Sequence, residues 1–162
     1  MKLIRALSAG MFAGLCSHTW AQTIVLPRTV PAQCVVQAAN RYDVPEILLV
    51  SIIKYESGGR PDAVNHNTNG SLDIGLGQFN TNSWVPFLQK NYGISPHSLM
   101  DSPCQAIMAQ AYVLRKIADT QCSGEVLWCA VGYYHSPTPK LRKQYIAAIY
   151  GEYQKILRRG HF

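Results

Sequence analysis

Apolar and polar positions along most of the chain alternate with the spacing of helices. Apolar side chains follow this spacing from Pro31 to Tyr42, and residues 47–53 are almost wholly apolar, which predicts a helix buried on most of its circumference. Glu56 stands at or near the end of this second helix. The Ser-Gly-Gly sequence at 57–59 tolerates the left-handed backbone of a helix end, and Pro61 prevents the helix from continuing.

The remaining pattern predicts one small hairpin and four more helices. Residues 63–75 are expected to form a two-stranded hairpin, because Asn69 and Gly70 both accept the positive φ of a tight turn. The helices are expected from Asn82 or Ser83 to Tyr92, from Pro103 to about Thr120, from Glu125 to Tyr134 and from Lys140 to Arg158. The expected fold class is therefore α+β, mainly helical, with a minor sheet.

The start of the chain differs from the rest. The chain has 162 residues, of which 48% are apolar, enough for one domain with a core. Its first five residues carry two basic side chains, Lys2 and Arg5, and residues 6–16 are apolar. Thr19, Trp20 and Ala21 occupy the cleavage positions of a signal peptide. We therefore expect a signal peptide at 1–21 and an exported domain at 22–162. The apolar run is shorter than the ~20 residues of a membrane span, so no stable membrane insertion is expected after cleavage.

Export changes the interpretation of the cysteines. Four remain after cleavage, at Cys34, Cys104, Cys122 and Cys129, and four cysteines allow three disulfide pairings. We favour Cys34 with Cys104, since both lie near the start of a predicted helix, and Cys122 with Cys129, which bracket a short loop. Metal binding is the alternative, but no Cys-x-x-Cys or His-Glu-x-x-His spacing supports it. We expect no metal and no other cofactor.

The charge is mildly basic. The formal net charge of +6 becomes +4 when Lys2 and Arg5 are removed, since the first 21 residues contain no acid. Basic side chains are dispersed, with small clusters only at 140–143 and 158–159, so nucleic acid is not the expected partner. A basic exterior would suit a cell-wall polymer that carries carboxylates.

One acid precedes the predicted hairpin and a second lies near its end. Glu56 lies one helical turn after Ile52 and shares its face, and a carboxyl group among apolar neighbours resists ionisation. A neutral Glu can donate a proton to a glycosidic oxygen, which a departing sugar requires. The hairpin would bring Asp73 back toward the same helix end. The alternatives are a solvent-facing Glu56 and an Asp73 that bonds its own turn backbone.

Three motifs in this region resemble known families. The stretch NHNTNGSLDIGLGQFNTNSW at 65–84 resembles the hairpin of the c-type lysozymes, and ES at 56–57 followed by GLGQ at 75–78 resembles the first two motifs of the bacterial lytic transglycosylases. The stretch AVGYYHSPTP at 130–139 is similar to their third motif, although His135 stands where that motif has Asn, which leaves its role open. Both families cleave peptidoglycan, and the resemblance implies a lysozyme-like fold with the hairpin beside the active-site cleft.

The resemblance also implies roles for individual residues. Glu56 would protonate the bond between N-acetylmuramic acid and N-acetylglucosamine and then take a proton from the muramyl O6 hydroxyl, which gives a 1,6-anhydro product without water. Gln78 would line the sugar cleft with support from Gly75, and Tyr134 would hold Glu56 by a hydrogen bond. Asp73 would stabilise the oxocarbenium-like state electrostatically, and the enzyme could then hydrolyse as well.

The predicted signal peptide, the small size and the sequences DSPC and YHS look most like the specialised transglycosylases (SLT domain) that accompany type IV secretion, conjugation, pilus and type III secretion machinery. This resemblance implies a periplasmic enzyme whose partners are peptidoglycan glycan strands and components of such an envelope-spanning machine. Two alternatives stay open: a lysozyme-type hydrolase, and a non-catalytic peptidoglycan-binding assembly factor.

Overall fold

The computed structural model describes residues 24–122 and 127–162, and the predicted signal peptide lies outside these ranges. Within them the chain forms helices and three short strands, in the order α1 (Ala32–Tyr42), α2 (Glu46–Ser57), β1 (Val64–His66), β2 (Leu72–Ile74), β3 (Phe79–Asn80), α3 (Trp84–Tyr92), α4 (Pro96–Asp101), α5 (Pro103–Gln121), α6 (Leu127–His135) and α7 (Pro139–Arg159). The mainly helical α+β class expected from the sequence is confirmed.

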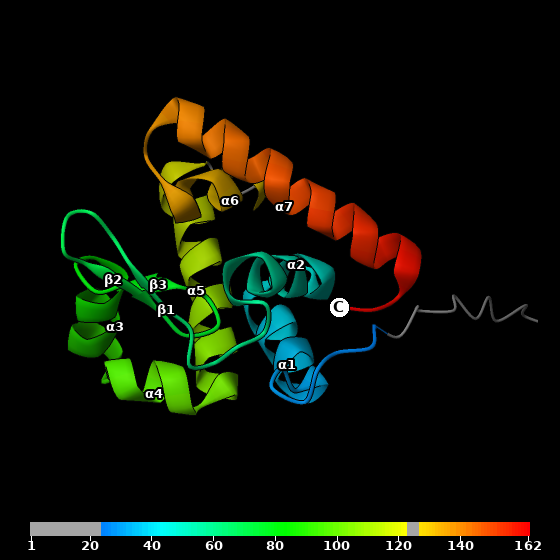
Figure 1. Cartoon of the computed structure of the whole chain (residues 1–162), viewed down its shortest axis with the longest axis horizontal. Coiled ribbons are helices and arrows are strands. Elements are labelled where there is room, and N and C mark those ends of the chain that lie inside the picture. The colour runs from blue at the N-terminus through cyan, green and yellow to red at the C-terminus, as the bar shows by residue number, and fades with distance from the viewer. Residues whose placement is uncertain (1–23, 123–126) are drawn as a thin grey trace, which may run out of the picture.

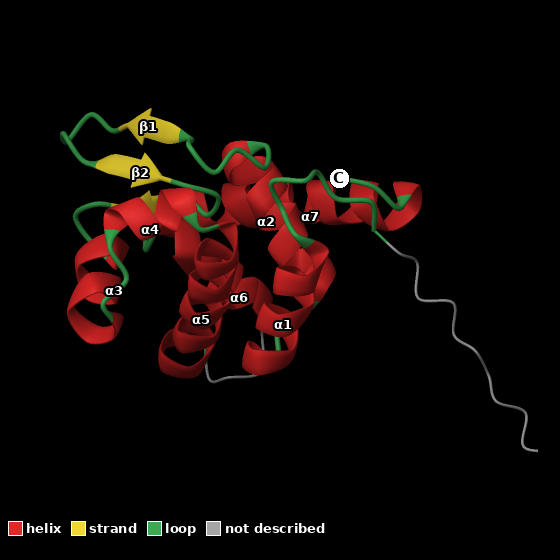
Figure 2. Cartoon of the chain, turned by 90° about the horizontal axis from the view of Figure 1, so that it is seen from below, coloured by secondary structure: helices red, strands yellow, loops and turns green. Residues whose placement is uncertain are grey.

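Helix α5 is the centre of the domain. It packs against α1, α2, α4 and α6, and Figure 1 shows it passing between the sheet side of the molecule and the remaining helices. The small and apolar residues of its sequence allow this close packing, since its buried positions include Ala106, Ile107, Ala111, Leu114 and Ile117. Helix α7 lies across α2 and α6, while the sheet, α3 and α4 occupy the opposite end, as Figures 1 and 2 show together.

The sheet has three antiparallel strands in the order β1-β2-β3, so the prediction of a two-stranded hairpin was incomplete. The predicted tight turn at Asn69 and Gly70 was also wrong in detail. The Gly70 N–H donates to the Asn67 carbonyl at 3.0 Å, and the Asn67 N–H donates to the Ser71 carbonyl at 2.9 Å. The register of β1 and β2 therefore leaves a loop of residues 68–70, in which Gly70 takes the positive φ of 79°.

One helix was missed. Helix α4 begins after Ser95, whose hydroxyl accepts a hydrogen bond from the Ser98 N–H at 3.1 Å, and Pro96 occupies its first turn. Leu99 is its one buried residue. A helix this short shows no apolar repeat, so periodicity could not detect it. The other helices lie close to their predicted positions, and the predicted start at Glu125 falls outside the described residues.

Both disulfides favoured from the sequence are present. Cys34–Cys104 joins α1 to the start of α5, and Cys122–Cys129 joins the end of α5 to α6.

Near the chain ends, the Val25 N–H donates to the Gly160 carbonyl at 2.8 Å and the Phe162 N–H donates to the Val25 carbonyl at 2.9 Å. Among the described residues, no helix has the length and apolar character needed to cross a membrane.

Candidate active site

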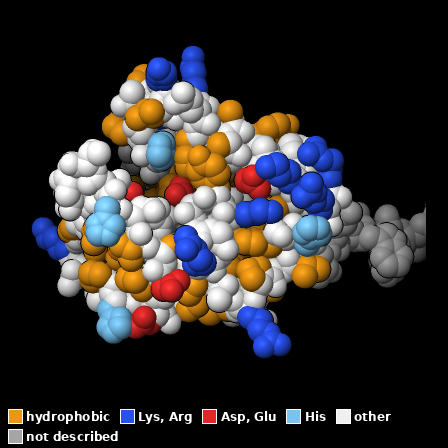
Figure 3. Space-filling view, in the orientation of Figure 1, with side chains coloured by type: hydrophobic (Ala, Val, Ile, Leu, Met, Phe, Trp, Pro, Cys, Tyr) orange, Lys and Arg blue, Asp and Glu red, His pale blue; other side chains and the backbone are white. Residues whose placement is uncertain are grey.

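A cleft of about 690 Å³ lies between the sheet and the α6–α7 corner. The wall on the sheet side is polar and includes Asn65, Asn67, Ser71, Asp73 and Asn80. The wall on the side of α6 and α7 includes Tyr133, Tyr134, His135, Pro137 and Leu141. Glu56 enters from the end of α2, and Trp84 enters from the start of α3. Figure 3 shows acidic side chains inside the hollow on the face toward the viewer.

Glu56 lies in the last turn of α2, and the residues before and after it fix its position. Ile52 and Ile53 before it are fully buried, and Gly58 after it takes a positive φ of 62°, as the sequence predicts for a helix end. Burial raises the pKa of Glu56 from 4.5 to about 7; a hydrogen bond from Tyr145 opposes this rise, and the negative charge of Asp73 adds to it. Near neutral pH a substantial fraction of Glu56 is therefore protonated and can act as an acid.

The tyrosine that bonds Glu56 is Tyr145, so the assignment of this bond to Tyr134 was wrong. The Tyr145 hydroxyl donates to the Glu56 carboxyl group, and its side chain is 2% exposed. The Tyr134 hydroxyl instead donates to the Gly77 carbonyl at 2.7 Å. Gly77 is closely packed there, because a Cβ atom at this position would lie 2.8 Å from the Tyr134 hydroxyl oxygen. Tyr134 thus joins α6 to the turn before β3.

Sequence reasoning missed Tyr145 for a physical reason. Its position matches the apolar face of α7, where Ile149 and Ile156 are also buried, so the spacing indicates an ordinary core residue. Burial and the neighbouring charge of Glu56 raise the pKa of Tyr145 well above 10, which keeps its hydroxyl protonated as a donor. Only the packing of α7 on α2 brings this hydroxyl to Glu56.

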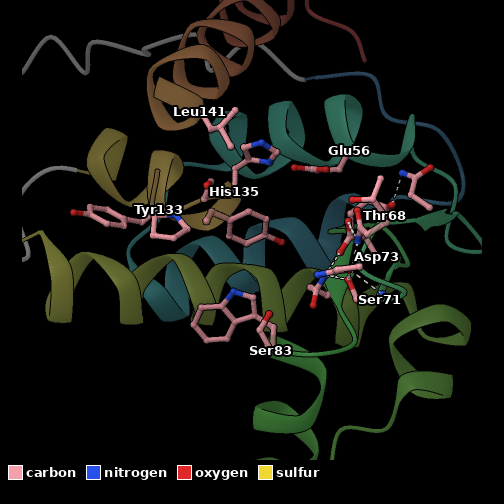
Figure 4. A pocket seen from close by; sticks show the side chains of 17 residues that line it. Glu56, Thr68, Ser71, Asp73, Ser83, Tyr133, His135 and Leu141 are labelled. Atoms are coloured by element: carbon pink, nitrogen blue, oxygen red, sulfur yellow. Dashed lines mark hydrogen bonds between the residues drawn. The ribbon is translucent and has the colours of Figure 1, made fainter. Parts of the chain in front are cut away.

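Asp73 faces the same cleft from the middle of β2. Its two carboxylate oxygens accept hydrogen bonds from the Asn67 side-chain amide at 2.9 Å and from the Asn80 side-chain amide at 2.8 Å. Figure 4 shows Asp73 on the sheet side of the cleft and Glu56 on the α2 side. The sheet therefore fixes a carboxylate across the cleft from Glu56, as the hairpin argument anticipated, and not in a bond to its own turn.

Gln78 and Gly75 build the base of the hairpin. The Gln78 amide nitrogen donates to the carbonyls of Ala63 at 3.2 Å and Gly75 at 2.8 Å, and its oxygen accepts from the Asn65 amide at 2.6 Å. Gln78 lines the cleft as expected, but these internal bonds occupy its polar atoms. Gly75 is not part of the cleft lining. It has a positive φ of 73°, and a Cβ there would lie 2.6 Å from the Leu99 carbonyl oxygen.

Chemically, the cleft offers a carboxyl group that is partly protonated near neutral pH opposite a fixed carboxylate, with open space for a chain-like ligand between them. This arrangement suits acid catalysis of a glycosidic bond. Within residues 24–122 and 127–162, no group of three or more His, Cys, Asp or Glu side chains is placed to hold a metal ion.

Comparison with known proteins adds an independent finding. Residues 33–153 match the family described as "Transglycosylase SLT domain". The chain is 35% identical over 132 residues to "Invasion protein IagB" of Salmonella typhimurium, which covers 79% of each chain. It is also 34% identical over 135 residues to "Protein IpgF" of Shigella flexneri, covering 81% of this chain and 86% of that protein.

Proposed function

The chain belongs to the transglycosylase SLT domain family, and on this premise we propose that it cleaves the β-1,4 bond between N-acetylmuramic acid and N-acetylglucosamine and leaves a 1,6-anhydro end. The family and the relatives support peptidoglycan lytic transglycosylase activity. The observation that carries the proposed chemistry is the environment of Glu56. It is a partly buried carboxyl group with a pKa of about 7, held by the hydrogen bond of Tyr145, in the wall of an open cleft.

In the first step, Glu56 gives its proton to the glycosidic oxygen. The C1–O bond breaks with its electron pair on that oxygen, so N-acetylglucosamine leaves as an alcohol. Positive charge develops at C1 of the muramyl sugar, where its own acetamido oxygen and the carboxylate of Asp73 stabilise it.

In the second step, the ionised Glu56 takes the proton of the muramyl O6 hydroxyl, and O6 forms a bond to C1. The carboxyl group returns to its protonated state, and no water is consumed. Tyr145 contributes to both steps because it fixes one oxygen of Glu56 and leaves the other for the substrate. Its hydrogen bond also stabilises the ionised form that exists between the steps.

Hydrolysis is the second candidate, and Asp73 is the feature that favours it. A transglycosylase that uses the acetamido group needs no second carboxylate, whereas a lysozyme-type enzyme uses one. Here two side-chain amides hold Asp73 in the cleft. A water molecule in place of O6 would give a reducing end.

Clearing of purified sacculi tests whether the protein is an enzyme at all. We expect the wild-type protein to lower the turbidity of the suspension and Glu56→Gln to leave it unchanged, with Glu46→Gln as a control at the exposed start of the same helix. Equal clearing by the wild-type protein and Glu56→Gln would refute the role of Glu56. No clearing by either protein would favour the non-catalytic wall-binding alternative.

The proposed setting is the periplasm, after removal of residues 1–21, with local opening of the wall for an envelope-spanning secretion, conjugation or pilus apparatus. The signal-like start of the sequence and the name "Invasion protein" of one relative support this setting. Fusion of residues 1–21 to a reporter that is active only after export tests the first part. An inactive, uncleaved fusion would contradict it.

A further inference from the structure

His135 is a cleft residue to which the proposed chemistry assigns no role. It is the last residue of α6, it lines the cleft, and its ring is stacked on that of Tyr145 with centroids 4.6 Å apart and planes 4° apart. Tyr145 is the buried residue that bonds Glu56. The stack therefore fixes the His135 ring next to the proposed acid, and Figure 4 shows the side chains of Glu56 and His135 directed toward each other.

The polar edge of this ring is open to the cleft. The stack with Tyr145 uses a face of the imidazole, whereas both nitrogens lie on its edge. Within the described part of the chain, neither nitrogen makes a hydrogen bond or an ion pair, and His135 is exposed. A neutral imidazole carries one N–H donor and one acceptor nitrogen, so a ligand in the cleft can use both.

The surroundings favour the neutral form of this ring. Although His135 as a whole is exposed, partial burial of its ring lowers its pKa, and the negative charge of Asp73 across the cleft opposes that shift. Other titratable or charged groups around this corner come from three helices: Glu56 of α2, Tyr133 and Tyr134 of α6, and Arg142 and Tyr145 of α7. The guanidinium carbon of Arg142 lies 4.0 Å from the centroid of the Tyr133 ring. A neutral donor suits this position, because an imidazolium would oppose positive charge developing on the sugar.

We propose that His135 binds the amino sugar at the cleaved bond by donating its ring N–H to an uncharged oxygen of that sugar, a hydroxyl or acetamido oxygen. It thereby orients the sugar against Glu56, and through the stack with Tyr145 it also positions the acid. This inference rests on the proposed function and adds a substrate-contacting residue to it.

The test uses the full chain carrying Glu56→Gln, so that a ligand is bound and not consumed. A soluble peptidoglycan tetrasaccharide is titrated while the ring nitrogens of each histidine are followed by NMR, and calorimetry gives the affinity. The His135 nitrogen signals should shift on binding and keep the pattern of a neutral ring. The signals of His97, which pairs with Asp101 on the distant helix α4, should stay in place.

Substitutions separate the polar role of His135 from its stacking role. In the same background, His135→Phe keeps an aromatic face for Tyr145 but has no donor, and we expect roughly fivefold to tenfold weaker binding, the effect of one hydrogen bond. His97→Phe should bind as its parent does. With Glu56 intact, His135→Phe should raise KM more than it lowers kcat. Since an imidazolium would oppose the positive charge on the sugar, kcat/KM of the wild-type protein should fall as the ring is protonated at acidic pH, and His135→Phe should lack this fall.

The outcomes are distinct. Binding of the tetrasaccharide without movement of the His135 signals, or undiminished affinity in His135→Phe, would overturn this inference and leave the proposed function intact. No tetrasaccharide binding together with no clearing of sacculi by the wild-type protein would overturn both. Should His135→Phe fail to fold, the NMR titration of the Glu56→Gln protein still decides, because it needs no change at His135.

Discussion

The raised pKa of Glu56 predicts a specific pH dependence of folding stability. In the unfolded chain this carboxyl group has its ordinary pKa of 4.5, whereas in the folded protein burial raises it to about 7. The folded state therefore holds this proton more tightly, and the associated stability is fully present below pH 4.5 and is lost as the pH rises to about 7. A shift of this size corresponds to about 3 kcal/mol, an order-of-magnitude value.

Glu56→Gln isolates this contribution. Glutamine has nearly the same shape, its oxygen can accept the hydrogen bond of Tyr145, and it carries no charge at any pH. We therefore expect the stability of the variant relative to wild type to increase by about 3 kcal/mol between about pH 4 and about pH 8. Guanidinium denaturation of the oxidised proteins, followed by tryptophan fluorescence, measures this difference. Glu46→Gln, at the exposed start of the same helix, should show no such increase.

If the stability difference between Glu56→Gln and wild type is the same at both pH values, or is larger at the acidic one, burial does not hold Glu56 in its neutral form. The acid chemistry would then lose its physical basis.

Two further substitutions test the surroundings of Glu56, and a third tests the packing of Gly75 against α4. Tyr145→Phe removes a hydrogen bond that favours the ionised form of Glu56. In a pH–rate profile, the pH above which activity declines should therefore rise, and kcat should fall roughly tenfold. An unchanged profile would contradict a role for this hydrogen bond. Asp73→Asn should lower kcat about 10²- to 10³-fold. It should also lower the pH above which activity declines, since the Asp73 charge raises the pKa of Glu56. Wild-type rates would show that the likeness to lysozyme is only structural. Gly75→Ala should lower the free energy of unfolding by about 3 kcal/mol in denaturant unfolding, because its Cβ would lie 2.6 Å from a backbone oxygen of α4. The control Gly70→Ala, whose Cβ would have nothing within 4 Å, should lower it by only about 1 kcal/mol, from left-handed backbone strain. Equal losses of stability would refute the packing argument.

Long apolar and helical patterns allowed most of the fold to be predicted from the sequence. The helix that carries Glu56 and its glycine ending were predicted because both signals are local. The three-residue loop at 68–70 and helix α4 were not, because the register of the strands and a six-residue helix leave almost no periodic trace. Local rules also cannot tell which of several turns fits a given pair of strands.

The candidate site was likewise predicted only in part from the sequence. Glu56 and Asp73 were proposed together because the hairpin that carries Asp73 was expected to fold back toward the helix end at Glu56, and both line the cleft. The partner of Glu56 was assigned to Tyr134, whose hydroxyl instead joins the Gly77 carbonyl. Tyr145 lies 89 residues from Glu56 along the chain, and its core-like spacing on α7 conceals its polar contact. Contacts between distant segments of this kind depend on the packing of whole helices, which a single sequence does not specify.

Mass spectrometry of the fragments released from purified sacculi, digested in ¹⁸O-labelled water, tests the central claim most directly. If Glu56 acts as acid and then as base on O6, the wild-type protein releases fragments that end in 1,6-anhydromuramic acid without the label, and Glu56→Gln releases none. Labelled reducing ends, or release of the same fragments by Glu56→Gln, would contradict it.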